Sequence, residues 1–310
     1  MNVLITPRGF AAYGQSEIEK MRSYGLKVHY NDTGLAYSDE EFLALAKNAD
    51  AIIVGVDIMD KRVIDQCPKL KVICKFGVGT DNIDVAYAES KNIYVGRTIG
   101  SNSNAVAEHV MSMIYCEAKN LWPTIRGVKN HQWQKPTGYE ISGKTLGIVG
   151  FGAIGKYLAK QAVGIGMTVQ VNDVFDIPTE VLDEYQVEKV DLDHLLKSSD
   201  YISLHLPLIN NTKNMISVNE FQMMKKTACL VNAARGGIVD EKALYEALIS
   251  GQIRSACFDV FSQEPPADKE PLLALDNFLL TSHTAARTVE SEKRTCAYST
   301  EIVMEKLRVL

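Results

Sequence analysis

Short apolar runs alternate with longer amphipathic segments along most of the chain. Before residue 100, the apolar runs predict strands at 3–6, 27–30, 51–56, 72–75 and 93–95. The segments between them predict helices at 16–24, 39–49, 61–67 and 85–90. Strands and helices that alternate in this way are typical of a parallel sheet with helices on both faces.

The same alternation resumes after residue 144. Strands are expected at 145–149, 169–172, 201–206, 229–232, 256–258 and 278–280, and helices at 154–163, 192–197, 218–225 and 241–249. A long helix at 102–119 would carry the chain out of the first domain, and a final helix within 291–310 would pack back on that domain. The sequence therefore predicts an α/β protein with two doubly wound parallel-sheet domains, formed by residues 1–99 with 287–310 and by residues 100–286.

Residues 120–143 do not follow this pattern. They contain both tryptophans, two prolines and mixed polar residues. We interpret the segment as an irregular arm between the domains or at a subunit contact. The alternative, that the tryptophans belong to a local core, stays open.

Composition narrows the class of protein. The 310 residues suffice for two domains, and the net charge of -5 provides no overall basic field for nucleic acid or anionic membrane. No apolar run approaches the ~18 residues that span a membrane, and the first residues predict a strand rather than a signal peptide. Scattered cysteines without CxxC pairs favour free thiols in a reducing compartment, so we expect a cytoplasmic protein.

The segment Gly150-Phe-Gly-Ala-Ile-Gly155 lies between an expected strand and an expected helix. In a dinucleotide site, the first glycine permits the turn, the second lets the backbone approach the pyrophosphate, and the third allows close helix–strand packing. Asp173 ends the next strand, where a carboxylate can accept both ribose hydroxyls and repel a 2′-phosphate, which favours NAD over NADP. The alternatives are a glycine-rich turn in another α/β protein and a solvated carboxylate at a strand end.

Three further polar residues follow strands at the edge where such sheets bind ligands. Arg235 lies in Asn232-Ala-Ala-Arg-Gly-Gly237 and suits bidentate binding of a carboxylate, although a surface arginine is equally compatible. His283 ends the last strand, and Glu264 precedes a proline pair. A histidine with a carboxylate nearby suits proton transfer near neutral pH. The alternatives are a structural histidine and a solvated acid.

Other candidate site residues have weaker support from the sequence. The turn Gly77-Val-Gly-Thr-Asp-Asn-Ile-Asp84 can point backbone N–H groups at an anion, or it is a plain turn. His205 is interpreted as structural, and His109 on the expected helix at 102–119 is a candidate to face a cleft. No set of histidines and carboxylates has zinc-site spacing, so no metal is expected.

Taken together, these motifs resemble the D-isomer-specific 2-hydroxyacid dehydrogenase family, in its phosphoglycerate-dehydrogenase-like branch. The resemblance covers nearly the whole chain in the right order. It rests on 77–84, Val106-Ala-Glu108, Gly150–Gly155 with Asp173, His205-Leu-Pro207 with Thr212, 234–237, 259–265 and His283-Thr-Ala-Ala286. It implies a flavodoxin-like substrate-binding (catalytic) domain and a Rossmann NAD domain with a cleft between them.

The resemblance also implies roles for single residues. Arg235 would bind the substrate carboxylate and polarise the 2-oxo group, and His283 would be the general acid for ketone reduction. Glu264 would orient His283 and keep it protonated, while the backbone at Val78 and Gly79 would hold the substrate carboxylate. The implied cofactor-binding residues are Gly150, Gly152, Ala153, Ile154, Gly155, Asp173, Leu206, Pro207, Thr212, Ala233, Ala234, Arg235, Asp259, His283 and Ala285, with Thr98 and Val106 near the nicotinamide.

Members of the family are commonly homodimers, so a homodimer is expected here. Phosphoglycerate dehydrogenases usually carry an arginine after the third strand, where this chain has Val54-Gly-Val-Asp57. The expected substrate is therefore a small unphosphorylated 2-oxo or 2-hydroxy acid such as glyoxylate or hydroxypyruvate. The alternatives are 3-phosphoglycerate and an NAD(H)-sensing, corepressor-like binding protein. Formate dehydrogenase chemistry is less favoured, because its relatives typically carry glutamine where Glu264 stands.

Overall fold

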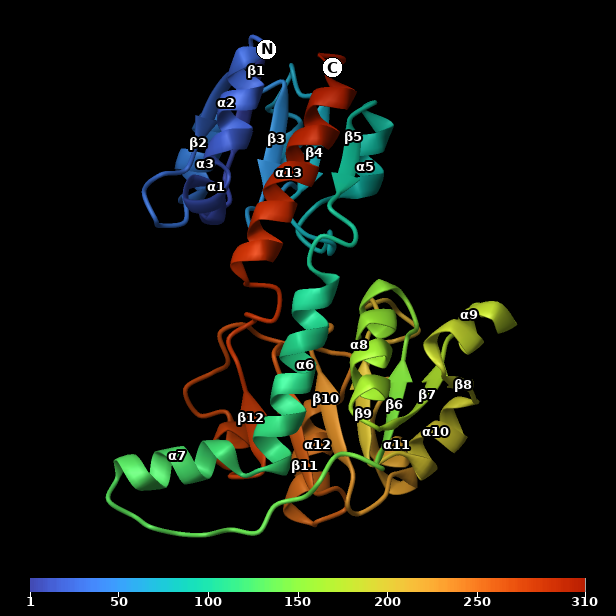
Figure 1. Cartoon of the computed structure of the whole chain (residues 1–310). Coiled ribbons are helices and arrows are strands. Elements are labelled where there is room, and N and C mark those ends of the chain that lie inside the picture. The colour runs from blue at the N-terminus through green and yellow to red at the C-terminus, as the bar shows by residue number, and fades with distance from the viewer. Residues whose placement is uncertain (310) are drawn as a thin grey trace. The chain divides into compact units, whose positions relative to one another are not determined.

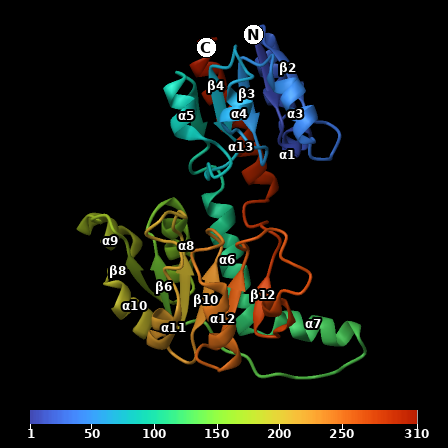
Figure 2. The same ribbon diagram turned by 180° about the vertical axis from the view of Figure 1, so that it is seen from behind.

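The chain divides into two compact units. The computed structural model describes residues 1–309. Unit 1 comprises Met1–Asn102 and the segment from Arg287 onward, and unit 2 comprises Ser103–Ala286. Figures 1 and 2 show that each unit is a twisted sheet between layers of helices.

Unit 1 is built on a five-stranded parallel sheet in the order β2-β1-β3-β4-β5. This is the flavodoxin-like order of doubly wound folds. Its strands are β1 (Asn2–Ile5), β2 (Lys27–Tyr30), β3 (Ala51–Val54), β4 (Val72–Lys75) and β5 (Tyr94–Arg97). Its helices are α1 (Arg8–Tyr13), α2 (Gln15–Ser23), α3 (Asp39–Ala46), α4 (Lys61–Ile64), α5 (Val85–Ser90) and α13 (Val289–Lys306).

The two faces of this sheet bury separate apolar cores. On one face, Leu4 and Ile52 pack with α3, α4 and α5. On the other, Val3 and Ile53 pack with α1, α2 and α13, to which α13 contributes Cys296, Val303 and Met304. The predicted packing of the C-terminal helix on the first domain is thus confirmed, and Figure 1 shows α13 lying along this sheet.

Unit 2 contains a seven-stranded parallel sheet in the order β12-β11-β10-β9-β6-β7-β8. The strand order reverses between β6 and β9, which is the Rossmann arrangement. The strands are β6 (Thr145–Val149), β7 (Thr168–Asn172), β8 (Glu188–Lys189), β9 (Tyr201–Leu204), β10 (Cys229–Asn232), β11 (Ser255–Phe258) and β12 (Phe278–Leu280). The helices are α6 (Ser103–Ala118), α7 (Leu121–Lys129), α8 (Ala153–Gly164), α9 (Thr179–Tyr185), α10 (Leu192–Ser198), α11 (Val218–Met223), α12 (Glu241–Ile249) and the 3₁₀ turn η1 (Pro271–Ala274).

Helices cover both faces of the second sheet as well. Ile148, Val171 and Val231 pack against α6 and α8, whereas Ile202, Leu204 and Leu230 pack against α10, α11 and α12. The central strands β6, β9, β10 and β11 are therefore buried on both sides, which explains why they are almost continuous apolar runs. The predicted class, two doubly wound parallel sheets, is confirmed.

The prediction of an irregular arm at 120–143 is wrong for its first part, because Leu121–Lys129 forms α7. Pro123 is tolerated there because the first turn of a helix needs no backbone N–H donor. In both views α7 points away from the sheet of unit 2, and the chain returns along a coil (Figures 1 and 2). The sequence reasoning also missed α1, α9 and the two-residue strand β8, and it placed the ends of β3 and β9 two residues too late.

Within residues 1–309, no helix has both the length and the apolar character needed to cross a membrane. The same part of the chain contains no cluster of three or more His, Cys, Asp or Glu side chains that could hold a metal ion.

Candidate functional site

The glycine fingerprint forms the turn between β6 and α8. Gly150 has φ +97°, and a Cβ there would collide with the carbonyl oxygen of His205. A Cβ at Gly155 would collide with the carbonyl of Gly150, whereas a Cβ at Gly152 would point into open space. Two glycines are thus required by backbone packing, and the middle one leaves room beside the start of α8. The first N–H groups of that helix have no intrahelical partner and can bind a phosphate.

Asp173 follows β7 and is tied to the same turn. Its Oδ2 accepts the N–H of Phe151 at 2.7 Å, and its Oδ1 accepts the N–H of Phe175 at 2.9 Å. The carboxylate is therefore fixed beside the glycines, where a ribose is bound in Rossmann folds. Val174 and Phe175 are 90% and 77% exposed, and no arginine occurs at 174–176. These residues fit a dinucleotide without a 2′-phosphate.

The segment after β9 lies next to this turn. Thr212 Oγ1 donates to the carbonyl of Pro207 at 2.6 Å and accepts the N–H of Ile209 at 2.9 Å, which closes residues 207–212 into a loop after Leu206. His205, which the sequence led us to interpret as structural, has its Nε2 2.9 Å from Ser203 Oγ, and burial lowers its pKa to about 4.

His283 and Glu264 form a direct pair. His283 Nδ1 is 2.7 Å from Glu264 Oε2, and Glu264 Oε1 accepts the N–H of Phe261 at 2.9 Å. The side chains are 50% and 39% exposed, so the pair lies at the surface of unit 2. Because Glu264 occupies Nδ1, the nitrogen available for proton transfer to a substrate is Nε2.

Asp259 holds the segment that carries His283. It is 1% exposed, and its carboxylate accepts the N–H groups of Thr284 and Ala285 at 2.8 Å each. Its carboxylate also accepts the Thr281 hydroxyl at 2.5 Å, and its main-chain oxygen accepts the N–H of His283. His283 has φ +54°, in the left-handed region, and these bonds hold it there. Sequence reasoning associated Asp259 only with the cofactor and missed this role.

Arg235 lies in the loop after β10, and this loop packs against the loop of Glu264. The fully buried Asn232 side chain accepts the N–H of Ala234 at 3.1 Å and donates to the carbonyl of Arg235 at 2.9 Å. A Cβ at Gly236 would collide with the carbonyl of Phe261, so only glycine permits this close packing. The structure thus brings the loops of Arg235, Glu264 and His283 together at the carboxyl ends of β10, β11 and β12.

The implied cofactor residues of unit 2 differ in burial. Ala153 is exposed and Ile154 is partly buried at the start of α8, and Gly155 is buried in its first turn. A second set lies in the apolar cores with exposures of 4% to 8%: Val106, Ala233, Ala234 and Ala285.

The predicted anion-binding turn lies in unit 1 after β4. Gly77 has φ +140°, and its N–H donates to the hydroxyl of the fully buried Thr98 at 2.9 Å. Lys75 Nζ donates to the carbonyl of Gly55 at 2.5 Å and to Asn82 Oδ1 at 2.7 Å, which joins the loops after β3 and β4. Val78 and Gly79 follow Gly77 in this turn.

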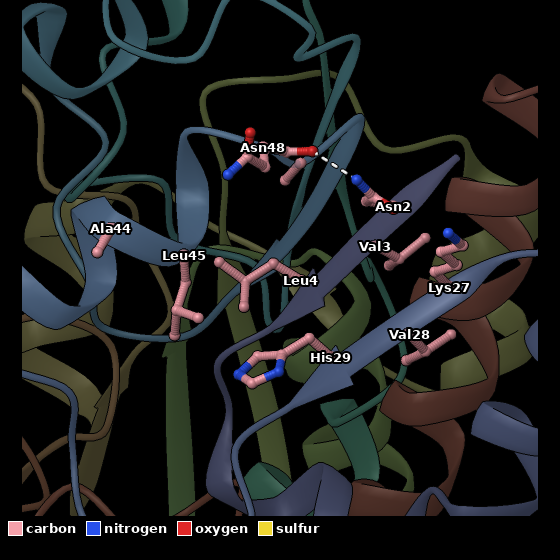
Figure 3. A pocket seen from close by; sticks show the side chains of 10 residues that line it. Asn2, Val3, Leu4, Lys27, Val28, His29, Ala44, Leu45 and Asn48 are labelled. Atoms are coloured by element: carbon pink, nitrogen blue, oxygen red, sulfur yellow. Dashed lines mark hydrogen bonds between the residues drawn. The ribbon is translucent and has the colours of Figure 1, made fainter.

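Unit 1 also has a cavity of about 290 Å³ at its β2 edge, which Figure 3 shows. Leu4, His29 and Leu45 line it, and Asn2 Nδ2 donates to the carbonyl of Asn48 at its rim. The cavity lies between α3 and the strands β1 and β2, whereas the Gly77 turn follows the carboxyl end of β4. Doubly wound sheets bind ligands at the carboxyl ends of strands, so we assign no chemistry to this cavity.

Several known proteins are similar to this chain in sequence and structure. Residues 111–285 match the family model described as "D-isomer specific 2-hydroxyacid dehydrogenase, NAD binding domain". A D-3-phosphoglycerate dehydrogenase of Methanocaldococcus jannaschii is 42% identical over 280 residues, which are 89% of this chain and 53% of that protein. The chain therefore spans about half the length of this archaeal relative.

Two further relatives are matched over nearly their whole length. A hydroxypyruvate reductase of Thermotoga maritima is 37% identical over 306 residues, which cover 91% of this chain and 99% of that protein. The crystal structure of a D-lactate dehydrogenase of Aquifex aeolicus, complexed with NAD and lactic acid, superposes with a TM-score of 0.82 at 29% identity. It covers 99% of this chain and 96% of the other.

Proposed function

Because the chain belongs to the D-isomer specific 2-hydroxyacid dehydrogenase family, we propose that it is an NAD-dependent oxidoreductase acting on a small unphosphorylated 2-oxo or D-2-hydroxy acid. The observation that carries this proposal is the 2.7 Å contact between His283 and Glu264, beside the loop of Arg235. The segment 111–285 is the NAD-binding domain of this family, and the turn at Gly152 with Asp173 fits that cofactor.

His283, Glu264 and Arg235 have different tasks in the reduction. When bound in unit 2, NADH would supply a hydride for C2 of the 2-oxo acid. His283 gives its Nε2 proton to the carbonyl oxygen, so the C=O bond becomes CH–OH and a neutral imidazole remains. Glu264 holds Nδ1 and thereby orients the ring, so that Nε2 faces the substrate. Arg235 binds the substrate carboxylate through two parallel hydrogen bonds and polarises the ketone.

Residues of unit 1 would complete the substrate site. The backbone N–H groups at Val78 and Gly79 would bind the substrate carboxylate, and residues 1–102 with the C-terminal segment would form the substrate-binding domain. In the loop after β3, Val56 is 77% exposed, and the Asp57 carboxylate accepts the hydroxyl of Thr6. A phosphate would require cations there, but residues 54–57 include no basic residue, and the neighbouring Lys75 Nζ already donates to the Gly55 carbonyl and to Asn82. An unphosphorylated acid such as glyoxylate or hydroxypyruvate therefore fits this loop better than 3-phosphoglycerate.

The test is NADH oxidation by the purified protein with glyoxylate, hydroxypyruvate, pyruvate and phosphorylated hydroxypyruvate. We expect the highest kcat/KM with one of the first three acids. A preference for the phosphorylated acid would favour a phosphoglycerate dehydrogenase instead. Tight NADH binding without turnover of any acid would contradict the enzyme and favour an NAD(H)-sensing binding protein.

We also propose a homodimer formed through α7. No residue of this helix is buried. Leu121, Ile125 and Val128 lie one turn apart on one face and are 44% to 50% exposed, next to Trp122 at 52%. A second copy of this surface would cover the apolar stripe.

Sedimentation of Ile125→Asp tests the dimer. The change should shift the protein from dimer to monomer, because it places a charge at the centre of the stripe. Ile249→Asp on α12, where the isoleucine is 53% exposed, is the matched control and should leave the dimer intact. A monomeric wild type would refute the proposal.

The six cysteines are all free, which suits the reducing cytoplasm that we propose as the location.

A further inference from the structure

His109 projects from α6 onto the segment that carries His283. Its Nε2 lies 3.0 Å from Thr281 Oγ1 and 3.5 Å from Asp259 Oδ1, and its side chain is 22% exposed. All of these residues belong to unit 2. The three roles proposed above for Arg235, Glu264 and His283 do not involve this histidine.

The hydrogen-bond directions in this network can be assigned. The Thr281 hydroxyl has one proton, and its shortest acceptor contact is Asp259 Oδ1 at 2.5 Å, against 3.4 Å to the carbonyl of Phe258. With its proton donated to Asp259, Thr281 Oγ1 accepts from His109, so His109 carries its proton on Nε2. The result is a relay from His109 through Thr281 to the carboxylate of Asp259.

This relay ends on the group that fixes the catalytic segment. The Asp259 carboxylate receives the N–H groups of Thr284 and Ala285, and its main chain receives that of His283. A carboxylate that is 1% exposed requires donors on every side to remain in place. A shift of this carboxylate would displace its bonds to Thr284 and Ala285, the two residues that directly follow His283.

We propose that His109 is a positioning residue for hydride transfer: through Thr281 it fixes the Asp259 carboxylate and thereby the imidazole of His283. The inference rests on the proposed dehydrogenase function. α6 is the first helix of unit 2, and the segment 281–286 is the last part of its chain. The contact therefore joins the two ends of this unit next to its catalytic histidine.

The first test compares His109→Leu with His109→Gln in NADH-dependent reduction of the preferred 2-oxo acid. The leucine variant should lower kcat about tenfold with an almost unchanged KM, because a small misplacement of a catalytic group affects the chemical step. Glutamine retains an amide donor at a similar reach and should recover most of the loss. Ser112→Ala is the control: its hydroxyl bonds the carbonyl of Glu108 on the same helix, outside the network.

A double-mutant cycle with Thr281→Val tests the path of the effect. If His109 acts through Thr281, then His109→Leu has no further effect on kcat in the valine background. Additive losses of kcat, or a failure of glutamine to recover activity, would overturn the proposal. All variants are compared at a temperature where circular dichroism shows them to be folded.

Histidine ring ¹⁵N spectra give a readout that does not need turnover. The wild type should show the Nε2-protonated tautomer for His109, and His109→Leu should shift the ring signals of His283 while Ser112→Ala leaves them in place. Unchanged His283 signals in the leucine variant would overturn the inference. If the His283 signals shift in His109→Leu but the wild type turns over none of the acids, the proposed dehydrogenase function is contradicted, whereas the structural coupling between His109 and His283 is supported.

Discussion

His205 should make the stability of unit 2 depend on pH between about 4 and 6.5. The residue directly follows β9, its Nε2 contacts Ser203 Oγ, and its Nδ1 is buried with no hydrogen-bond partner among residues 1–309. Burial lowers the pKa of His205 from its usual value of 6.5 to about 4. In the unfolded chain the imidazole is in water and takes up its proton near the usual value.

The sign and size of the effect follow from this difference. Between pH 6.5 and 4, the unfolded state binds a proton that the folded state does not, so the free energy of unfolding falls as the pH falls. The stabilisation is fully present above the unfolded pKa and is lost toward the folded pKa. At 1.36 kcal/mol per pKa unit, the whole window corresponds to about 3 kcal/mol.

Urea unfolding of wild type and His205→Gln, followed by circular dichroism, measures this effect. Both proteins lose stability in acid through their carboxylates, so the informative quantity is the difference between their losses from pH 7 to pH 4.5. From pH 7 to pH 4.5, the free energy of unfolding of the wild type should fall by about 2 kcal/mol more than that of His205→Gln. His194→Gln, at an exposed histidine, should behave like the wild type. Equal losses in wild type and His205→Gln would refute the reasoning.

Three other changes test the site and its scaffold. His283→Ala should lower kcat for reduction by about two to four orders of magnitude while NADH still binds; an unchanged kcat would remove His283 from the mechanism. Asp173→Asn removes the charge that repels a 2′-phosphate, and should raise the kcat/KM ratio of NADPH to NADH by about tenfold; an unchanged ratio would contradict the assignment. Glu117→Gln leaves the guanidinium of Arg254, bound at 2.8 and 3.0 Å, without its counter-ion. In urea unfolding, Glu117→Gln should lower the free energy of unfolding by about 3 kcal/mol. The control Asp193→Asn, which removes an exposed ion pair within a helix, should lower it by less than about 0.5 kcal/mol. Similar losses for the two variants would contradict a special role for the Glu117–Arg254 pair.

Much of the scaffold could be predicted because it is encoded locally. A strand covered on both faces must be apolar at almost every position, and a run such as Leu146-Gly-Ile-Val149 meets that condition without knowledge of its neighbours. The capping box at Ser38 and Glu41 likewise sets the start of α3 from four consecutive residues. The failures were elements with weak local signals, such as the six-residue α1 and the exposed α7.

The sequence by itself determined the two parallel sheets, the glycine turn with Asp173, and the identity of Arg235, Glu264 and His283 as candidates. These features can be recognised in the sequence because each is encoded by a single strand, by the turn that follows a strand, or by the order of motifs along the chain. Only the tertiary structure decided that His109 and Thr281, separated by 172 positions, lie 3.0 Å apart, and that Asp259 holds the backbone around His283. Such contacts depend on how α6 packs against the ends of β11 and β12, and that packing is the sum of many buried side chains that no local stretch of sequence specifies.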